Sequence, residues 1–507
     1  MTLLSDQTLA HKLISKGSIA YIASFLIAPV WYLLRIIASN NMDVSDIGLF
    51  YSMIGLIGLL AAYNDLWLTE ALQYFLPKYW IEKKYNHYKT IRIMTFGMQL
   101  VSWILIGWGL WLGADWLSIH YFESTQTSHI LKVFSLYFVA INFLQALASV
   151  YTAFQDIFSD KLIETIRLYS VLLCTLVFTF LGSLSLTTFS YAWLWWLGIA
   201  LVVSIFLCGV KYGKTLSMGN FILDKELIKT QLSYAFWVFL WLNAGTLLGQ
   251  IDQQIVIVFL GAADAGYFSN YLSLFSIYGI FLWPLMWLIF PITTELITKN
   301  HTQKIILFIQ ILYKYFSVFA ISVIWFFVAL GPTISATLYG QQFIYSGTLL
   351  QYGAPFIIFN MLIVINFWFL AGMGKAKERV FVIVAGLLIN IVMNMVSILV
   401  FKRWLYGVVL ATGMSWIVMF WMSLSIIRKA YVIIYNRWFM VRNLLLVSIL
   451  SCVLWYTAWY VDLTDRMPNF VHLAGMGIAY YCIIAGFNYK NIALLWRECK
   501  SLWFVKK

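Results

Sequence analysis

Two carboxylates and an amide interrupt one of the most apolar stretches of this chain, residues 54–80. If the stretch is a helix, Asp65, Glu70 and Gln73 fall in one sector of its surface, at about 100° per residue. Ionisable side chains at membrane depth are costly, so they usually face a cavity. We therefore expect this sector to face a hydrated interior. The alternative is that Glu70 and Gln73 lie close enough to Lys78 to reach the headgroups on the cytoplasmic side.

Amide side chains form a similar stripe on a second apolar stretch, residues 242–261, while Asp252 points in another direction. The stripe consists of the amides Asn243, Gln250, Gln253 and Gln254, together with Thr246. Amides suit sugar hydroxyls because they both donate and accept hydrogen bonds, and they also join helices to one another in membranes. Both interpretations remain open for this stripe. Asn390 and Asn394 lie one turn apart on a later stretch and fit the second interpretation better.

Basic and proline residues inside apolar stretches point to anion binding and to bends. The basic residues are Arg35, Arg167 and Lys314. Arg35 is near the outer end of its stretch, where it could instead extend to the outer surface. Lys314 is the hardest to explain in that way, so it is the better candidate for a buried cationic site. The prolines, which mark either gating bends or static kinks, are Pro29, Pro77, Pro284 and Pro291.

The residues that most enzymes and metal sites need are badly placed or missing. All six histidines fall in loops or at predicted helix ends, which disfavours a membrane acyltransferase or a metal hydrolase. The five cysteines are widely spaced, so the sequence indicates neither a disulfide framework nor a zinc site. The net charge of +13 is better explained by basic cytoplasmic loops than by nucleic-acid binding. We therefore expect no metal, no cofactor and no nucleic-acid partner.

The composition indicates that these stretches are surrounded by lipid instead of water. The chain has 507 residues, of which 63% are hydrophobic and only 10% are charged, whereas soluble proteins have about 25% charged residues. In lipid, only helices and closed barrels satisfy the backbone. The apolar runs here are continuous and long enough for a helix to cross a bilayer, at about 20 residues. The sequence predicts an all-α polytopic membrane protein.

We predict fourteen membrane-spanning helices with both termini in the cytoplasm. Most of the 33 basic residues then lie on the cytoplasmic side, as the positive-inside rule requires. The predicted spans are 16–38, 47–76, 91–114, 130–153, 162–184, 190–209, 232–258, 266–296, 305–330, 348–371, 380–400, 405–427, 441–460 and 470–488.

The spans form two halves of six helices, followed by one further pair. The expected domains are a six-helix lobe at 1–212, a basic cytoplasmic linker at 213–231, a second six-helix lobe at 232–430, and two extra helices with a basic tail at 431–507. DIGLF (Asp46–Phe50) in the first half corresponds to DAGYF (Asp264–Phe268) in the second. Since six helices return each half to the same side, a pseudo-two-fold axis along the membrane normal would relate the halves. That architecture is typical of transporters with a substrate site between the halves.

Three stretches carry a resemblance to a known family. They are DVSDIGLFYSMIGLIGLL at 43–60, DLWLTEALQYFLPKYW at 65–80 and GQIDQQIVIVFLGAADAGYFSNYLSL at 249–274. With them, almost the whole chain resembles the bacterial polysaccharide (O-antigen type) flippases of the multidrug/oligosaccharidyl-lipid/polysaccharide exporter superfamily. The resemblance implies two six-helix bundles plus two terminal helices, in a multi-pass protein of the bacterial cytoplasmic (inner) membrane.

The resemblance also implies a substrate and a mechanism. In that family, a sugar chain on undecaprenyl pyrophosphate moves to the outer leaflet by alternating access, and a cationic cavity between the bundles receives the pyrophosphate. The implied pyrophosphate ligands are Arg35, Lys314 and Arg167, and the implied ion-coupling residues are Asp65, Glu70, Asp252 and Glu295. The expected partners are membrane lipids, the lipid-linked glycan, and a glycan polymerase or glycosyltransferases. The protein itself is expected to be a monomer.

Two other functions stay open beside the flippase. The first is a cation-coupled exporter of drugs or small metabolites, although the multidrug branch usually has twelve helices. The second is a membrane glycosyltransferase or glycan polymerase, although the longest outer loop, at 331–347, holds no charge. Within the flippases, SNNMDVSD at 39–46 replaces the arginine–aspartate pairing of the lipid II branch, which disfavours a peptidoglycan precursor as cargo.

Overall fold

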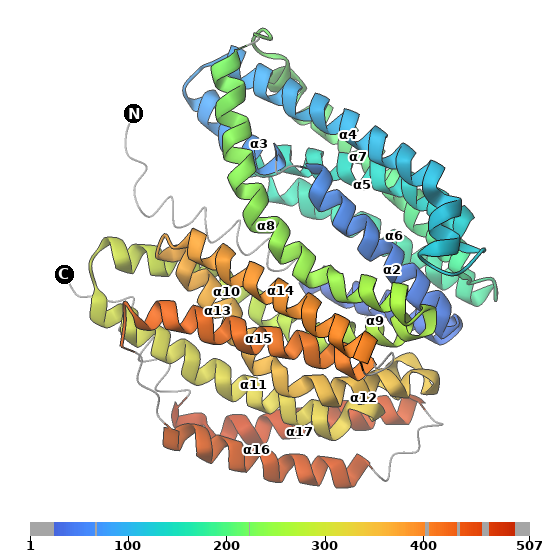
Figure 1. Ribbon diagram of the computed structural model, residues 1–507, viewed down its shortest axis with the longest axis vertical. Helices are drawn as coiled ribbons and strands as arrows, with labels where there is room; N and C mark the ends of the chain where they lie inside the picture. The colour runs from blue at the N-terminus through green and yellow to red at the C-terminus, as the bar shows by residue number, and fades with distance from the viewer. Residues whose placement is uncertain are drawn as a thin grey trace. The chain divides into compact units, whose positions relative to one another are not determined.

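The computed structural model describes residues 25–65, 68–222, 224–400, 405–432, 437–458 and 466–491. Every regular element in these ranges is a helix (Figure 1), because a backbone in lipid must satisfy its polar groups internally. Eleven helices of the described part are long and apolar enough to cross a membrane. The predicted all-α membrane fold is therefore confirmed. The count of fourteen spans and their orientation remain predictions.

The chain divides into two compact units, Met1–Gly266 and Tyr267–Lys507, and α9 (Ala262–Ser276) crosses the boundary between them. Among the described residues, the first helix of the N-terminal unit covers 25–41. The unit continues with α2 (Val44–Asp65), α3 (Leu68–Ile81), α4 (Tyr85–His120), α5 (Thr127–Ala153), α6 (Ile157–Phe180), α7 (Leu186–Ser217) and α8 (Lys225–Phe259). The domain limits expected from the sequence stay a prediction.

The C-terminal unit ends in the extra pair of helices. Its elements are α10 (Gly279–Thr298), α11 (Thr302–Tyr339), η1 (Gln341–Phe343), α12 (Ile344–Gly353), η2 (Ala354–Phe356), α13 (Ile357–Gly372), α14 (Ala376–Val400), α15 (Leu405–Arg428), α16 (Arg437–Ala458) and α17 (Arg466–Phe487). Helix α16 packs along α11, and α17 contacts both (Figure 1). The extra pair is therefore attached to the rest of this unit through α11.

The predicted span 266–296 contains two helices instead of one, α9 and α10. The predicted span 47–76 takes in α2 and part of α3, and residues 66 and 67 between them lie outside the described residues. Between α9 and α10, the N–H of Ile280 donates to the carbonyl of Ile277 at 3.2 Å, which closes a turn over residues 277–280. The prolines expected to mark bends do not coincide with this turn. Pro29, Pro77, Pro284 and Pro291 all lie inside helices, a position that membrane helices tolerate.

The two related pentapeptides meet through their glycines in the N-terminal unit. A Cβ atom on Gly48 would lie 1.9 Å from the carbonyl oxygen of Ala262, and a Cβ atom on Gly266 would lie 2.1 Å from that of Val44. Only glycine lets the starts of α2 and α9 cross with their backbones in contact. The sequence pattern identified the two copies but not their contact.

The segment between α7 and α8 binds to the start of α4. The Nζ of Lys89 donates to the carbonyl of Gly219 at 2.9 Å. The hydroxyl of Thr90 donates to the carbonyl of Ile222 at 3.1 Å and accepts from its N–H at 2.9 Å. Gly219 has φ +82°, and a Cβ atom there would lie 2.2 Å from the carbonyl oxygen of Tyr85. This part of the predicted linker is thus fixed to the N-terminal unit.

Candidate functional site

The amide stripe predicted from the sequence lies on α8 and contacts α2. Gln253 and Gln254 are both buried. The Nε2 of Gln253 donates to the Oγ of Ser52 at 2.9 Å and to the carbonyl of Ala265 at 3.1 Å. Gln254 donates to the carbonyl of Ser52 at 3.1 Å and accepts from the hydroxyl of Tyr121 at 2.8 Å. These two amides therefore make contacts between helices, and a role in binding sugar stays a prediction.

Gly55 on α2 makes room for the stripe. A Cβ atom there would lie 2.7 Å from the Nε2 of Gln254 and 3.0 Å from the Oε1 of Gln250. Gln250 is half-buried, and Asp252 is buried on the same helix. The side chain of Asn243 lies outside the described residues. Three of the four predicted amides thus gather at α2.

A second buried polar cluster joins α2, α4 and α5. The Nδ2 of Asn64 donates to the Oδ1 of Asn142 at 3.4 Å, and the hydroxyl of Ser102 donates to the Oδ1 of Asn64. Asn142 in turn donates to the carbonyl of Phe138 at 2.7 Å. Sequence reasoning missed this cluster. The available signal was the position of Asn64, directly before Asp65 on the same polar stretch.

Arg35 and Arg167 approach one aromatic cluster of the N-terminal unit. The guanidinium carbon of Arg35 lies 3.4 Å from the centroid of the Tyr51 ring, and that of Arg167 lies 6.0 Å from the Trp193 ring. Phe50, the neighbour of Tyr51 in the chain, packs against Trp193 with ring centroids 5.9 Å apart. Aromatic faces attract such cations. The structure therefore brings two of the three predicted cations to the same group of rings.

Arg167 is a buried cation. Helix α6 begins at Ile157, before the predicted span of 162–184, and Arg167 lies within this helix. The residue is 8% exposed, its Nε has no hydrogen-bond partner, and its polar neighbour is the hydroxyl of Tyr137. No carboxylate in the described ranges forms an ion pair with it. Because a buried charge without a counter-charge is costly, an anion would be stabilised strongly here.

The structure describes the side chains of only some of the predicted ion-coupling acids. Glu295 is exposed near the end of α10 and forms an ion pair with Lys299, with nitrogen and oxygen 2.5 Å apart. The side chains of Asp65 and Glu70 lie outside the described residues. Gln73, in the same predicted sector, is half-buried on α3. Nowhere in the described part do three acidic, histidine or cysteine side chains gather as a metal site.

The remaining candidates belong to the C-terminal unit. The Nζ of Lys314 lies 4.8 Å from the centroid of the Phe439 ring on α16. Asn390 and Asn394 are fully buried on α14. Asn394 donates to the Oδ1 of Asn390 at 3.1 Å, and Asn390 donates to the hydroxyl of Thr412 on α15 at 3.5 Å. This geometry is that of a contact between α14 and α15.

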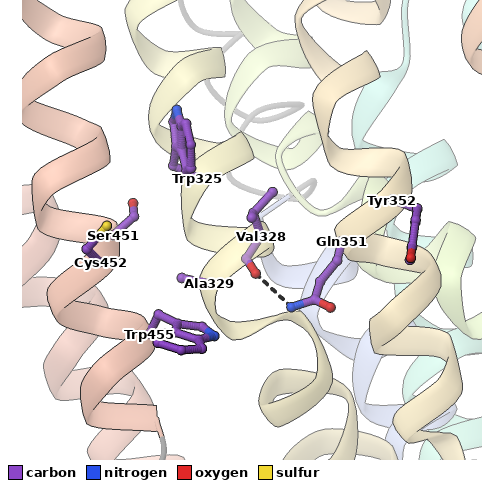
Figure 2. Close-up of a pocket in the computed structure, with 8 residues that line it drawn as sticks. All are labelled: Trp325, Val328, Ala329, Gln351, Tyr352, Ser451, Cys452 and Trp455. Atoms are coloured by element: carbon purple, nitrogen blue, oxygen red, sulfur yellow. Dashed lines mark hydrogen bonds between the residues drawn. The ribbon is translucent and has the colours of Figure 1, made fainter.

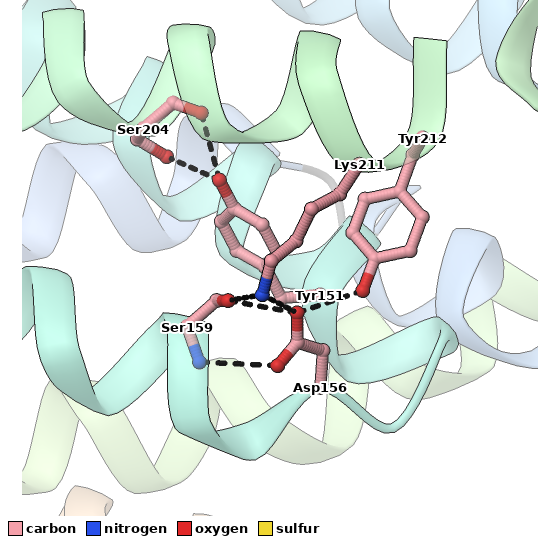
Figure 3. A network of polar contacts seen from close by, with 6 residues as sticks. All are labelled: Tyr151, Asp156, Ser159, Ser204, Lys211 and Tyr212. Atoms are coloured by element: carbon pink, nitrogen blue, oxygen red, sulfur yellow. Dashed lines mark hydrogen bonds and ion pairs between the residues drawn. The ribbon is translucent and has the colours of Figure 1, made fainter. Parts of the chain in front are cut away.

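A polar network ties the start of α6 to the end of α7 (Figure 3). Asp156 precedes α6 and accepts from the N–H of Ser159 at 3.1 Å. Its Oδ2 also accepts from the Nζ of Lys211 at 2.9 Å and from the hydroxyl of Tyr212 at 2.8 Å. Burial by itself would raise the pKa of Asp156, but these hydrogen bonds outweigh burial and lower the pKa to about 2. The network stabilises the contact between these two helix ends, and it was not apparent from the sequence.

A cavity of about 420 Å³ lies between α11, α12 and α16 of the C-terminal unit (Figure 2). Trp325, Tyr352 and Trp455 line it. Gln351 also lines it, but its amide donates to the carbonyl of Val328 at 2.7 Å. A mainly aromatic and aliphatic lining of this kind suits hydrocarbon better than sugar. None of these residues was predicted as part of a site.

Comparisons with known proteins concern the fold. No family model matches the chain. One relative is an uncharacterised membrane protein of Methanocaldococcus jannaschii, 21% identical over 476 residues, which cover 90% of this chain and 91% of that protein.

Two solved structures align with almost the whole of their own chains. One is the lipid II flippase MurJ in an inward closed conformation, with a TM-score of 0.68, 14% identity, and coverage of 94% of this chain and 99% of MurJ. The other is a multidrug resistance MATE family transporter of the MOP superfamily in an inward-facing conformation, with a TM-score of 0.65, 14% identity, and coverage of 81% and 100%.

The chain has the fold of MurJ and the MATE transporters. This agrees with the superfamily that the sequence resembles, while its O-antigen branch stays a prediction. The MurJ alignment includes more of this chain than the MATE alignment does.

Proposed function

We propose that this chain is a flippase that moves a lipid-linked oligosaccharide, of the undecaprenyl-pyrophosphate type, across the cytoplasmic membrane by alternating access. The glycan would serve the biosynthesis of a surface polysaccharide. One observation carries the proposal: the fold likeness to a lipid flippase extends over 94% of this chain, against 81% for a multidrug transporter. More of this chain thus has a counterpart in a protein that moves a lipid-linked substrate.

The two arginines of the N-terminal unit are the proposed pyrophosphate ligands. A guanidinium group binds phosphate oxygens through paired N–H donors and stays charged at any physiological pH. Arg167 is buried without a carboxylate partner among the described residues, and Arg35 approaches the same aromatic rings. We keep Asp65, Glu70 and Asp252 as proposed ion-coupling residues.

A strain that lacks the protein is expected to accumulate the lipid-linked glycan on the cytoplasmic leaflet, because flipping connects synthesis to export. The measurement uses a glycan-labelling reagent that cannot cross membranes, and it compares the labelling of intact cells with that of inverted vesicles. The deletion should give strong labelling only in the inverted vesicles. A deletion strain with normal surface glycan would refute the proposal.

Replacing Asp65 with asparagine is expected to reduce transport while leaving membrane insertion intact. The amide keeps the shape of the carboxylate but loses its charge and its ability to exchange a proton. The measurement is restoration of surface glycan in the deletion strain, at matched protein levels. The control is Asp115→Asn, because that carboxylate is 69% exposed in a loose ion pair with Lys132. Full restoration by Asp65→Asn would remove Asp65 from the site.

A cation-coupled exporter of drugs or small metabolites is the second candidate, because a multidrug transporter shares the fold at a TM-score of 0.65. The same deletion strain separates the two functions. An exporter predicts increased drug sensitivity with normal glycan. The third candidate, a glycosyltransferase or glycan polymerase, predicts sugar transfer by the purified protein.

A further inference from the structure

Two cations from different helices of the C-terminal unit share one aromatic neighbour. The Nζ of Lys314 on α11 lies 4.8 Å from the centroid of the Phe439 ring, and the guanidinium carbon of Arg442 on α16 lies 5.6 Å from the same centroid. Arg442 is also 5.1 Å from the Phe487 ring, at the end of α17. Three helices thus contribute side chains to one cluster of cations and rings, which we call the cationic cluster.

The two cations of the cationic cluster, Lys314 and Arg442, form no ion pair within the described residues. The polar neighbour of Lys314 is the hydroxyl of Tyr315 at 3.4 Å, which donates its own proton to the carbonyl of Asn491 at 2.6 Å. Two like charges that share a neighbour repel each other, so a bound anion would stabilise both.

The cationic cluster lies toward the predicted cytoplasmic ends of its three helices, from which long basic side chains can extend to the lipid phosphates. Helix α11 has 38 residues and is therefore about 57 Å long, whereas the hydrocarbon core is about 30 Å thick. Lys314 lies in the first third of α11, Arg442 lies in the second turn of α16, and Phe487 ends α17. These are the helix ends that the charge pattern assigns to the cytoplasm.

The surface beside the cluster is apolar. Val441 and Leu445 on α16 and Phe487 on α17 are exposed large hydrophobic side chains. In a membrane such a surface faces acyl chains, while soluble anions reach only the headgroup layer. A ligand that combines a phosphate with acyl chains would bind the cations through its phosphate and cover this surface with its acyl chains.

We propose that the cationic cluster binds the phosphate headgroup of an anionic phospholipid in the cytoplasmic leaflet. Lys314 and Arg442 bind the phosphate, and the exposed ring of Phe487 contacts the adjoining acyl chains, while the buried ring of Phe439 lies beside both cations. Since α16 and α17 pack on α11, the bound lipid stabilises the attachment of the extra helix pair. The inference does not depend on the transported substrate.

The test measures thermal unfolding of the purified, delipidated full-length chain in detergent. Mixed micelles that contain phosphatidylglycerol are expected to raise the melting temperature by several degrees, and micelles with the same mole fraction of phosphatidylcholine are not. Arg442→Gln should reduce that rise by at least half, and Lys314→Gln combined with Arg442→Gln should abolish it. The matched control is Lys377→Gln, an exposed lysine at the start of α14, which should retain the full rise.

Several outcomes would overturn the proposal. An equal rise with phosphatidylcholine would mean ordinary solvation by lipid. A rise with inorganic phosphate or pyrophosphate alone would mean a site for soluble anions. A full rise in Arg442→Gln would remove Arg442 from the site. Counting bound phosphatidylglycerol by native mass spectrometry gives a readout that does not depend on stability. A transport defect in the deletion strain would leave this inference unaffected.

Discussion

Replacement of Gly48 by valine is expected to prevent the N-terminal unit from folding, because the added side chain would force α2 away from α9. A Cβ atom at this position would lie 1.9 Å from the carbonyl oxygen of Ala262 and 2.6 Å from the backbone nitrogen of Gly266. Both atoms belong to the backbone, so no side-chain rotation relieves the overlap. Overpacking of this kind costs about 3 kcal/mol or more. The measurement is the yield of monodisperse protein and its melting temperature in detergent.

The matched control is Gly58→Val on the same helix. A Cβ atom there meets nothing within 4 Å, so this variant should fold and melt close to the parent chain. Gly266→Val should fail as Gly48→Val does, because its Cβ atom would lie 2.1 Å from the carbonyl oxygen of Val44. A normal melting temperature for Gly48→Val would show that the two helices do not cross in backbone contact.

Replacement of Asp156 by asparagine is expected to lower the free energy of unfolding by about 2 kcal/mol near neutral pH. The carboxylate is 15% exposed and accepts hydrogen bonds from Lys211, Tyr212 and the N–H of Ser159. Its pKa in the folded chain is lowered to about 2 from an ordinary value of 3.8. Since the pKa is lower in the folded than in the unfolded state, the stabilisation is fully present above about pH 4 and is lost as the pH falls toward 2.

The melting temperatures of both proteins between pH 7 and pH 3 test this dependence. The difference between parent and variant should be constant at neutral pH and should shrink below about pH 4. The control is Asp115→Asn, because the ion pair of Asp115 with Lys132 is exposed to solvent and such pairs add little to stability. A loss in Asp156→Asn that does not change with pH would assign the effect to the shape of the helix cap instead of the charge.

The sequence by itself determined the solvent, the fold class and the approximate place of each helix. Apolar runs of bilayer length leave the backbone no alternative to helices in lipid, and a helix lies in every predicted span. The helical wheel also indicated which positions are polar. It could not show the break at Ile277, because a turn between two apolar helices changes neither composition nor periodicity.

Only the tertiary structure decided which helix each polar face contacts. The amide of Gln254 bonds to Tyr121, and that of Asn64 bonds to Asn142, across long separations in sequence. A membrane helix is apolar on nearly every side, so hydrophobicity does not distinguish the face that packs from the face that meets lipid. The burial of Arg167 likewise depends on the packing of α6, which places its side chain beside the Trp193 ring. The physical reason is the same in each case: periodicity specifies a direction around one helix, whereas the partner in that direction depends on how all the helices pack.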